Sequence, residues 1–107
     1  MLPKGNRAGT KQVEKIFKEG RFLNSHSLTF KYNLTKIPPT RISFIAPKSI
    51  ARLAVKRNLL RRRGYSALRK YIPDLPAGTE GVFIFKKPEA DISVLDHEIK
   101  EILHKIN

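Results

Sequence analysis

The sequence of 107 residues contains no cysteine. This absence excludes disulfide bonds and thiolate metal sites, and it suits a reducing compartment. Long apolar runs are missing too, because the longest, ISFIA and VFIF, fall far short of the ~20 residues of a transmembrane helix. The N-terminus also lacks the apolar core of a signal peptide. We therefore expect a soluble cytoplasmic protein.

Acidic residues are scarce as well. The chain has nine Asp plus Glu residues against 22 Lys plus Arg residues, which gives a net charge of +13 at pH 7. So large a charge on a small body opposes its compaction and attracts polyanions. Nucleic acid is the first candidate partner, and an anionic membrane surface is the second.

A chain of this length predicts one domain, residues 1–107, with one modest core. Residues 1–9 are polar and rich in Gly, so we expect them to be flexible. A helix is predicted from Thr10 to about Glu19, with Gly20 as its stop. The apolar face of this helix consists of Val13, Ile16 and Phe17.

Alternating apolar and polar residues from Ser27 to Leu34 predict a half-buried strand. The side chains on its apolar side are Leu28, Phe30, Tyr32 and Leu34. The segment IPPT at 37–40 predicts a turn, because two prolines do not fit a central strand. A returning strand is expected at 42–46.

A long helix is predicted next, with Ser49 as its cap, an end near Tyr71 and Pro73 as its stop. Gly64 lies in its middle and costs about 1 kcal/mol relative to Ala. We therefore expect a neighbour that packs too closely at Gly64 to leave room for a side chain.

The continuous apolar run at 82–85 predicts a strand covered on both faces. A last helix begins at Asp91 or Ser93. Its apolar stripe recurs at helical spacing and consists of Leu95, Ile99, Ile102, Leu103 and Ile106. This order of elements predicts the α+β class, with a layer of helices packed on a layer of sheet.

The positive charge is concentrated in one segment. Between Lys48 and Tyr71 the chain has no acidic residue and nine cations, which are Lys48, Arg52, Lys56, Arg57, Arg61, Arg62, Arg63, Arg69 and Lys70. Five of the nine acids gather at the last helix, at Glu89, Asp91, Asp96, Glu98 and Glu101. We expect one positive side of the molecule and one side that is nearly neutral or acidic.

A helical wheel with about 100° per residue separates the faces of the basic helix. The side assigned to the sheet carries Leu53, Leu60, Gly64, Ala67, Leu68 and Tyr71. One flank carries Asn58, Arg61, Arg62, Tyr65 and Arg69, and the other carries Arg52, Lys56, Arg63 and Lys70. Arg57 is placed at the seam between helix and sheet.

A basic helix is often only a solvated face, but this one lacks the Glu residues that would neutralise it. Like charges three or four residues apart disfavour an isolated helix, and the guanidinium fork suits phosphate oxygens. We therefore interpret this helix as a phosphate-binding surface. Asn58 suits a hydroxyl, a base edge or a metal-bound water, and a local backbone hydrogen bond is an equally good explanation.

The residues resemble a known family. AVKRNLLRRR, which follows a predicted strand ending in SFIAPKS, resembles the A-V-x-R-N-R-x-K-R region of the bacterial ribonuclease P protein component. VEKIFKEGRF is similar to the F-x-x-V-F-x-x-G helix end of that family, and VFIFKKPEADISVLDHEIKEIL fits its usual ending. The resemblance covers nearly the whole chain in order.

The motif can be carried over residue by residue. Ala54 and Val55 match its start, Arg57 and Asn58 match its Arg-Asn pair, and Arg61 and Arg62 match its later Lys-Arg pair. Leu59 and Tyr65 stand where the family usually has Arg, which indicates a divergent member. Arg52 and Arg63 are candidates for replacement charge.

The resemblance implies an α/β two-layer sandwich of three helices and a mostly antiparallel sheet of about four strands, in the order α-β-β-β-α-β-α. It also implies a left-handed βαβ crossover through the basic helix, whereas chain physics alone favours a right-handed one. The ribosomal protein S5 domain 2 has the same kind of fold.

The function implied is that of the smaller subunit of an RNA enzyme that removes the 5′ leader from precursor tRNA. The catalytic RNA of that enzyme holds the Mg²⁺ ions, so we expect no catalytic residue, no metal ligand and no obligate protein partner for this chain, and no membrane. The three histidines agree, because His26, His97 and His104 show no ligand spacing or triad order.

By the same resemblance, the basic helix binds the catalytic RNA. With the neighbouring cations, the expected RNA-binding residues are Lys48, Arg52, Lys56, Arg57, Asn58, Arg61, Arg62, Arg63 and Arg69. A cleft between the first helix, the sheet and the basic helix is expected to hold the single-stranded leader. Val13, Phe17 and Tyr32 match family positions that line this cleft, and Phe44 is a further candidate; Phe17 and Tyr32 would suit the core equally well.

Two other functions share the charge of this chain. A structural RNA-binding protein of the ribosomal type has the same composition and the same layered fold. A DNA-binding protein would need polar side chains of one helix aimed at base edges, whereas the cations here lie along two edges of the helix. The Arg-Asn motif after the strand favours the enzyme subunit.

Overall fold

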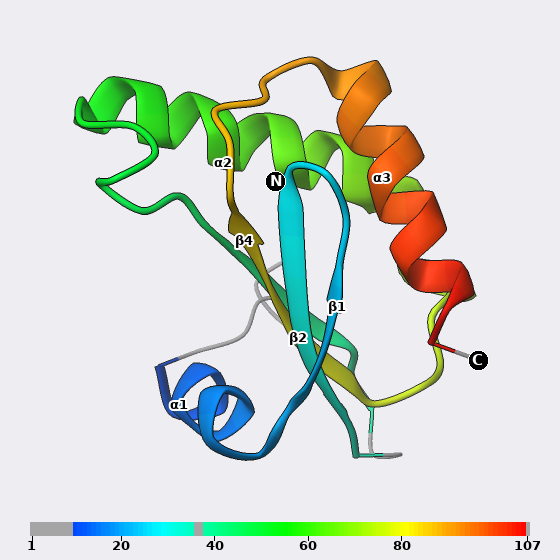
Figure 1. The fold of residues 1–107 in the computed structure, drawn as a ribbon. Helices are drawn as coiled ribbons and strands as arrows, with labels where there is room; N and C mark the ends of the chain where they lie inside the picture. Colours follow the sequence, from blue (N-terminus) through cyan, green and yellow to red (C-terminus); the bar gives the residue numbers. More distant parts are fainter. Residues whose placement is uncertain (1–9, 36–37, 107) are drawn as a thin grey trace.

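The computed structural model describes residues 10–35 and 38–106. The predicted flexible segment, residues 1–9, lies outside this range. In the described part, three α-helices and four strands follow one another in the expected order (Figure 1). The helices are α1 (Thr10–Glu19), α2 (Ala54–Leu68) and α3 (Ile92–His104), and the strands are β1 (Arg21–Asn24), β2 (Leu28–Leu34), β3 (Arg41–Ile45) and β4 (Thr79–Phe85). None of the helices in these two ranges has the length and apolarity needed to cross a bilayer.

The four strands form one mixed sheet in the order β1-β2-β4-β3. Strands β1 and β2 are antiparallel, as are β2 and β4, whereas β3 and β4 are parallel neighbours. Parallel neighbours need a crossover, and α2 provides it between β3 and β4. The expected left hand of this crossover stays a prediction.

The main core lies between the sheet and the two helices α2 and α3 (Figure 1). The predicted alternation of β2 is confirmed, because Leu28, Phe30 and Tyr32 are buried and the residues between them are only partly so. The rings of Phe30, Phe44 and Phe83 stack across three adjacent strands. Burying a side chain of this size contributes about 1.5–3 kcal/mol, so these rings anchor the sheet beneath the helices.

Helix α1 packs on the opposite face of the sheet, against β2 and β4. Its buried residue Ile16 and the buried Val82 of β4 belong to this second layer and not to the main core. The predicted apolar face of α1 is confirmed at Ile16 alone, because Val13 is half-buried and Phe17 is exposed. We call this side of the sheet the α1 face; it carries Thr29, Lys31, Asn33, Val82 and Ile84.

Helix α2 begins four residues later than predicted. Ser49 does not cap it; the residue before Ala54 is Leu53, whose backbone is extended and whose side chain makes no capping hydrogen bond. Leu53 was also expected to face the sheet, but 60% of its surface is exposed. The reason is local, because the backbone N–H groups of Ile50 and Ala51 donate to the Pro47 carbonyl and form a turn there.

The end of the basic helix is close to the predicted one. Helix α2 ends at Leu68 and continues as a 3-10 helix, η2 (Arg69–Asp74), which contains Pro73. The expected close approach at Gly64 is confirmed, because a Cβ atom there would lie 2.5 Å from Cε1 of Phe44. Helix α3 also starts as predicted, with the Asp91 carboxylate accepting the Ser93 N–H at 2.8 Å.

Candidate nucleic-acid interface

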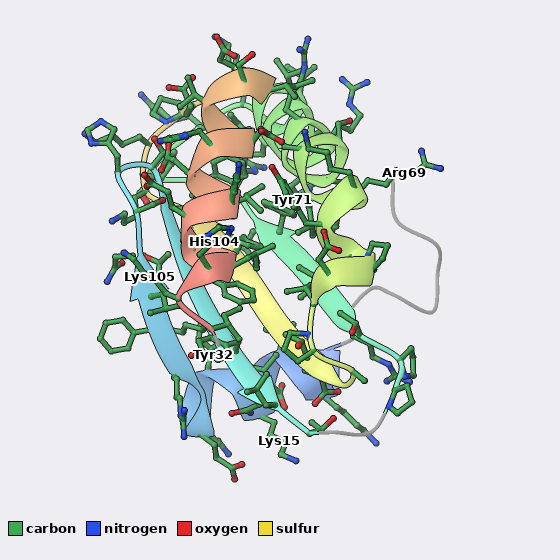
Figure 2. The ribbon with its side chains drawn as sticks, turned by 90° about the vertical axis from the view of Figure 1, so that its right-hand side faces the viewer. Lys15, Tyr32, Arg69, Tyr71, His104 and Lys105 are labelled. Atoms are coloured by element: carbon green, nitrogen blue, oxygen red, sulfur yellow. The ribbon has the colours of Figure 1, made fainter. Side chains whose placement is uncertain are left out.

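The expected RNA-binding residues lie together on α2, on the loop before it and at the start of η2. Seven of the nine are exposed, namely Lys48, Arg52, Lys56, Asn58, Arg62, Arg63 and Arg69, whereas Arg57 and Arg61 are half-buried. Arg69 projects from the body of the molecule at the end of α2 (Figure 2). We call this set the basic surface.

The buried side of α2 turns these cations outward. Leu60, Gly64, Ala67 and Leu68 are buried against the sheet and α3, as the helical wheel predicts. Because they recur at spacings of three and four, the intervening cations have to point away from the core. Packing of the core thus fixes the orientation of the charge.

Almost none of this charge is neutralised within the protein. Of the nine cations between Lys48 and Tyr71, only Lys70 forms an ion pair in the described part of the chain, with Asp96 of α3 at 2.7 Å. The Lys70 ammonium holds the pKa of Asp96 below its usual range, against the opposing effect of burial and with help from a Tyr71 hydrogen bond. The arginines of the basic surface pair with none of the described carboxylates.

The other acidic side chains on and near α3 bind partners that are not part of the basic surface. Asp91 caps α3, and Glu89 accepts the Asp91 N–H at 3.2 Å. Glu98 points to the turn between β1 and β2, where it accepts the Ser27 N–H, and Glu101 pairs with His97. None of these four carboxylates pairs with a cation of the basic surface, and the expected separation of a positive and an acidic side stays a prediction.

Arg57 holds the loop that precedes α2. Its Nη1 atom donates to the carbonyl oxygens of Ala51, at 3.1 Å, and Arg52, at 2.8 Å. These bonds satisfy backbone groups that the late start of α2 leaves outside any regular element. Arg57 thus orders the loop that carries Arg52, and its predicted place at the seam between helix and sheet stays a prediction.

Asn58 is paired with an arginine side chain. The Nη2 atom of Arg61 donates to Oδ1 of Asn58, one turn earlier on the same flank. The amide oxygen therefore orients the Arg61 guanidinium, which leaves the amide NH₂ of Asn58 available as a donor. A shallow groove of about 380 Å³ runs along this flank and is lined by Val55, Asn58, Arg61, Arg62 and Tyr65.

Tyr65 differs from its expected place on the exposed flank, because it is buried. Its ring meets Phe44 edge-on, with the ring centroids 5.0 Å apart, and its hydroxyl oxygen accepts the Phe44 N–H at 3.1 Å. Strand β3 is at the edge of the sheet, where outward N–H groups lack a strand partner. Tyr65 accepts a hydrogen bond from one of these N–H groups and packs at the contact between α2 and β3.

The predicted leader cleft is not assembled as expected. Tyr32 and Phe44 are buried in the main core, on the side of α2 and α3, whereas Val13 and Phe17 belong to α1 on the opposite face. Tyr32 lies on the α3 side of the sheet (Figure 2). Tyr32 and Phe44 are therefore core residues. Tyr32 also lines a hollow of about 700 Å³ with Lys15 and Glu19 of α1, but Val13, Phe17 and Phe44 are not among its lining residues.

Two residues that were not predicted as site residues, Lys31 and Phe22, lie on the same face of the sheet as Phe17. Lys31 lies next to Tyr32 in β2 and so points to the α1 face, where its Nζ atom lies 4.8 Å from the centroid of the Phe17 ring. Phe22 of β1 is directly opposite Lys31 in the register, so both point to the same face, and 64% of Phe22 is exposed. Phe17, Phe22 and Lys31 form what we call the aromatic platform.

A comparison with protein families gives the decisive match. The family model described as Ribonuclease P matches residues 7–107. The chain belongs to the ribonuclease P protein family. It is 30% identical over 96 residues to the ribonuclease P protein component of Borrelia hermsii, and the alignment covers 89% of this chain and 82% of that protein.

Solved ribonuclease P proteins share the fold. The Staphylococcus aureus protein is 17% identical, with a TM-score of 0.81 and coverage of 97% of both chains. The Thermotoga maritima protein is 20% identical, with a TM-score of 0.81 and coverage of 94% of this chain and 97% of that one. These matches confirm the predicted α+β class with four strands and three helices.

Family membership makes the chain the protein subunit of ribonuclease P, a tRNA-processing enzyme that associates with the ribonuclease P RNA. It favours this function over the ribosomal-type and DNA-binding alternatives. The structure also shows what the two departures from the ribonuclease P motif do. Tyr65 packs in the core instead of binding phosphate. Leu59 is half-buried and lines a groove together with residues of the loop that precedes α2.

Proposed function

We propose that the basic surface binds the catalytic RNA of ribonuclease P and that the aromatic platform binds the single-stranded 5′ leader of precursor tRNA. The observation that supports the first part is the set of arginines on α2 without carboxylate partners among the described residues. Cations in such an arrangement displace the counterions of an RNA backbone, which drives binding.

The platform suits an unpaired strand. The exposed rings of Phe17 and Phe22 offer surfaces on which bases stack, and Lys31 between them supplies charge for a phosphate. Stacking of this kind tolerates any sequence, because every base has a π-face. A protein with such a platform would recognise a leader by its single-stranded state.

In this proposal the chemistry is carried by the RNA, which holds the Mg²⁺ ions, and the protein acts in the cytoplasm. The basic surface lowers the repulsion between the phosphates of the two RNAs. Less repulsion brings the precursor closer, and it leaves the RNA's own metal sites easier to fill at low Mg²⁺. No side chain of the protein takes part in bond cleavage.

Reconstitution tests this function. The protein is mixed with ribonuclease P RNA and a leader-bearing precursor tRNA at near-physiological Mg²⁺ and salt, and the cleavage rate and substrate affinity are measured. We expect the folded protein to raise both relative to the RNA alone. Unchanged cleavage together with unchanged affinity would refute the proposal.

The platform has its own test. Replacing Phe17 or Phe22 by Ala should weaken the affinity of the assembled enzyme for leader-bearing precursor by about fivefold, the low end of the effect of one base-stacking contact. Affinity for mature tRNA, which has no leader, should stay the same. Leu34→Ala is the matched control, because Leu34 is 41% exposed and Phe17 is 43% exposed. Equal losses for both tRNAs would argue against a leader site.

A further inference from the structure

An apolar groove opens between the loop that precedes α2 and the loop that precedes α3. It has a volume of about 500 Å³, within the range of about 300–1,000 Å³ of pockets that hold small molecules. Its walls are Ile50, Ala51, Leu53, Leu59, Leu60, Pro88 and Ala90, and Arg52 and Lys56 are its only charged lining residues. No acidic residue lines it, although Glu89 lies between Pro88 and Ala90 in the chain, so the groove is apolar inside and its positive charge comes from Arg52 and Lys56 on the α2 side.

One wall of this groove is held rigidly. Arg57 binds the carbonyl oxygens of Ala51 and Arg52, and the turn at Pro47 fixes Ile50. The wall is therefore formed before any ligand arrives, and little conformational entropy is lost on binding.

Leu53 is the residue that needs an explanation. It occupies the N-cap position of α2, where Ser, Thr, Asp or Asn would stabilise the helix better. It is also 60% exposed, and its neighbour Val55 is exposed as well. A large apolar side chain at a solvent-facing cap is costly to the free protein, and it is useful where it covers a ligand.

We propose that this groove takes one unstacked nucleobase of the ribonuclease P RNA. The proposal rests on the docking of α2 on that RNA. The occupant follows from charge and position, because Arg52 and Lys56 belong both to the groove and to the basic surface. A backbone phosphate held by these two cations places its base over the apolar walls, and Leu53 and Leu59 cover the faces of the base.

The base contact also gives a role to Leu59. Its half-buried side chain lines the groove and completes an apolar wall, so the RNA gains a contact that salt does not screen. The affinity contributed by the apolar side chains of the groove should therefore not depend on ionic strength, in contrast to that of the cations.

Leu53→Asn is the variant that tests the groove. It removes the apolar cover and places a favourable capping residue at the start of α2, so loss of folding is not expected and a thermal melt checks it. Affinity for ribonuclease P RNA should fall by about fivefold, as for one base contact, with an unchanged salt slope. Leu53→Phe should retain the affinity, and Leu34→Asn, on the distant end of β2, should leave it unaltered.

Chemical probing of the RNA supplies the second readout. The wild-type protein should protect one unpaired base from base-directed reagents, and Leu53→Asn should remove this protection while the hydroxyl-radical footprint on the backbone persists. Full affinity and full base protection in Leu53→Asn would overturn the proposal, as would a flatter salt slope. Failure of the RNA docking itself is separate, because it would also abolish the effect of changing Arg61 and Arg62.

Discussion

Replacing Arg61 and Arg62 together by Ala should weaken binding to ribonuclease P RNA by about 100-fold, because hydrogen bonds to charged groups contribute about 1.5–3 kcal/mol each. The salt dependence should flatten too. Each lost phosphate contact lowers the slope of log K against log salt concentration by about 1, so the double variant should lose about 2. Titrations over a series of salt concentrations measure both effects.

The matched control removes the same charge elsewhere. Lys100 and Lys105 are exposed on and after α3, and neither belongs to the basic surface. Changing both to Ala lowers the net charge by the same amount, so an effect of overall charge would appear in both double variants. Equal losses of affinity, or an unaltered slope for the arginine variant, would contradict phosphate contacts at Arg61 and Arg62.

The second large effect is expected from replacing Glu98, and it concerns the stability of the fold. Its side chain is only 5% exposed, and its Oε1 atom accepts hydrogen bonds from the Ser25 hydroxyl and, at 2.6 Å, from the Ser27 N–H. Burial alone would raise the pKa of Glu98, but these hydrogen bonds together hold the pKa below its usual value. The carboxylate thus ties α3 to the turn between β1 and β2.

Glu98→Gln should lower the free energy of unfolding at neutral pH by about 1.5–3 kcal/mol, the range for a hydrogen bond to a charged group. Because the folded-state pKa of Glu98 is depressed, its stabilising effect is complete above the unfolded-state value and is lost as the pH falls through the folded one. The difference between wild type and Glu98→Gln should therefore shrink below about pH 4.3, the ordinary pKa of Glu.

Urea unfolding at neutral and acidic pH measures this difference. Glu101→Gln is the control, because Glu101 lies on the same helix and is exposed, with a surface pair to His97. Surface pairs of this kind contribute about 0–1 kcal/mol, so its effect should be small at every pH. A difference for Glu98→Gln that stays constant with pH would rule out a role for the charge.

Regular periodicity made much of the fold predictable. The alternation of apolar residues predicted β2, and the apolar stripe at helical spacing predicted α3. Both patterns are regular because each element packs one face on the core along its whole length. The close contact at Gly64 could also be predicted, because glycine inside a helix is destabilising relative to Ala. In contrast, β1 has only four residues and no buried side chain, so it carries no pattern to detect.

The start of α2 could not be predicted, because hydrogen bonds within the loop that precedes it determine where the helix begins. Ser49 satisfies the local rule for a cap, yet the turn at Pro47 and the hydrogen bonds of Arg57 shape the loop instead. The burial of Tyr65 depends in the same way on an open N–H group at the edge of β3. Neither partner is visible in a helical wheel.

The position of the basic surface was predictable, but the composition of the cleft was not. Alternation shows that Phe30 and Tyr32 share one face of β2 and that Lys31 has the other. It does not show which of the two faces α1 covers. A shift of one residue in the pairing register would move every side chain of the strand to the opposite face. The structure places Lys31 beside Phe17, and the register of β1 adds Phe22.

The central claim is that the RNA lies along the exposed face of α2, and tethered cleavage tests it most directly. The chain has no cysteine, so Val55→Cys on α2 and Val94→Cys on α3 each provide a single attachment point for an iron chelate that generates hydroxyl radicals. Both valines are exposed. We predict strand scission of ribonuclease P RNA from position 55 and little or none from position 94. Equal scission from both positions, or scission from position 94 alone, would contradict RNA binding by the acid-free face of α2.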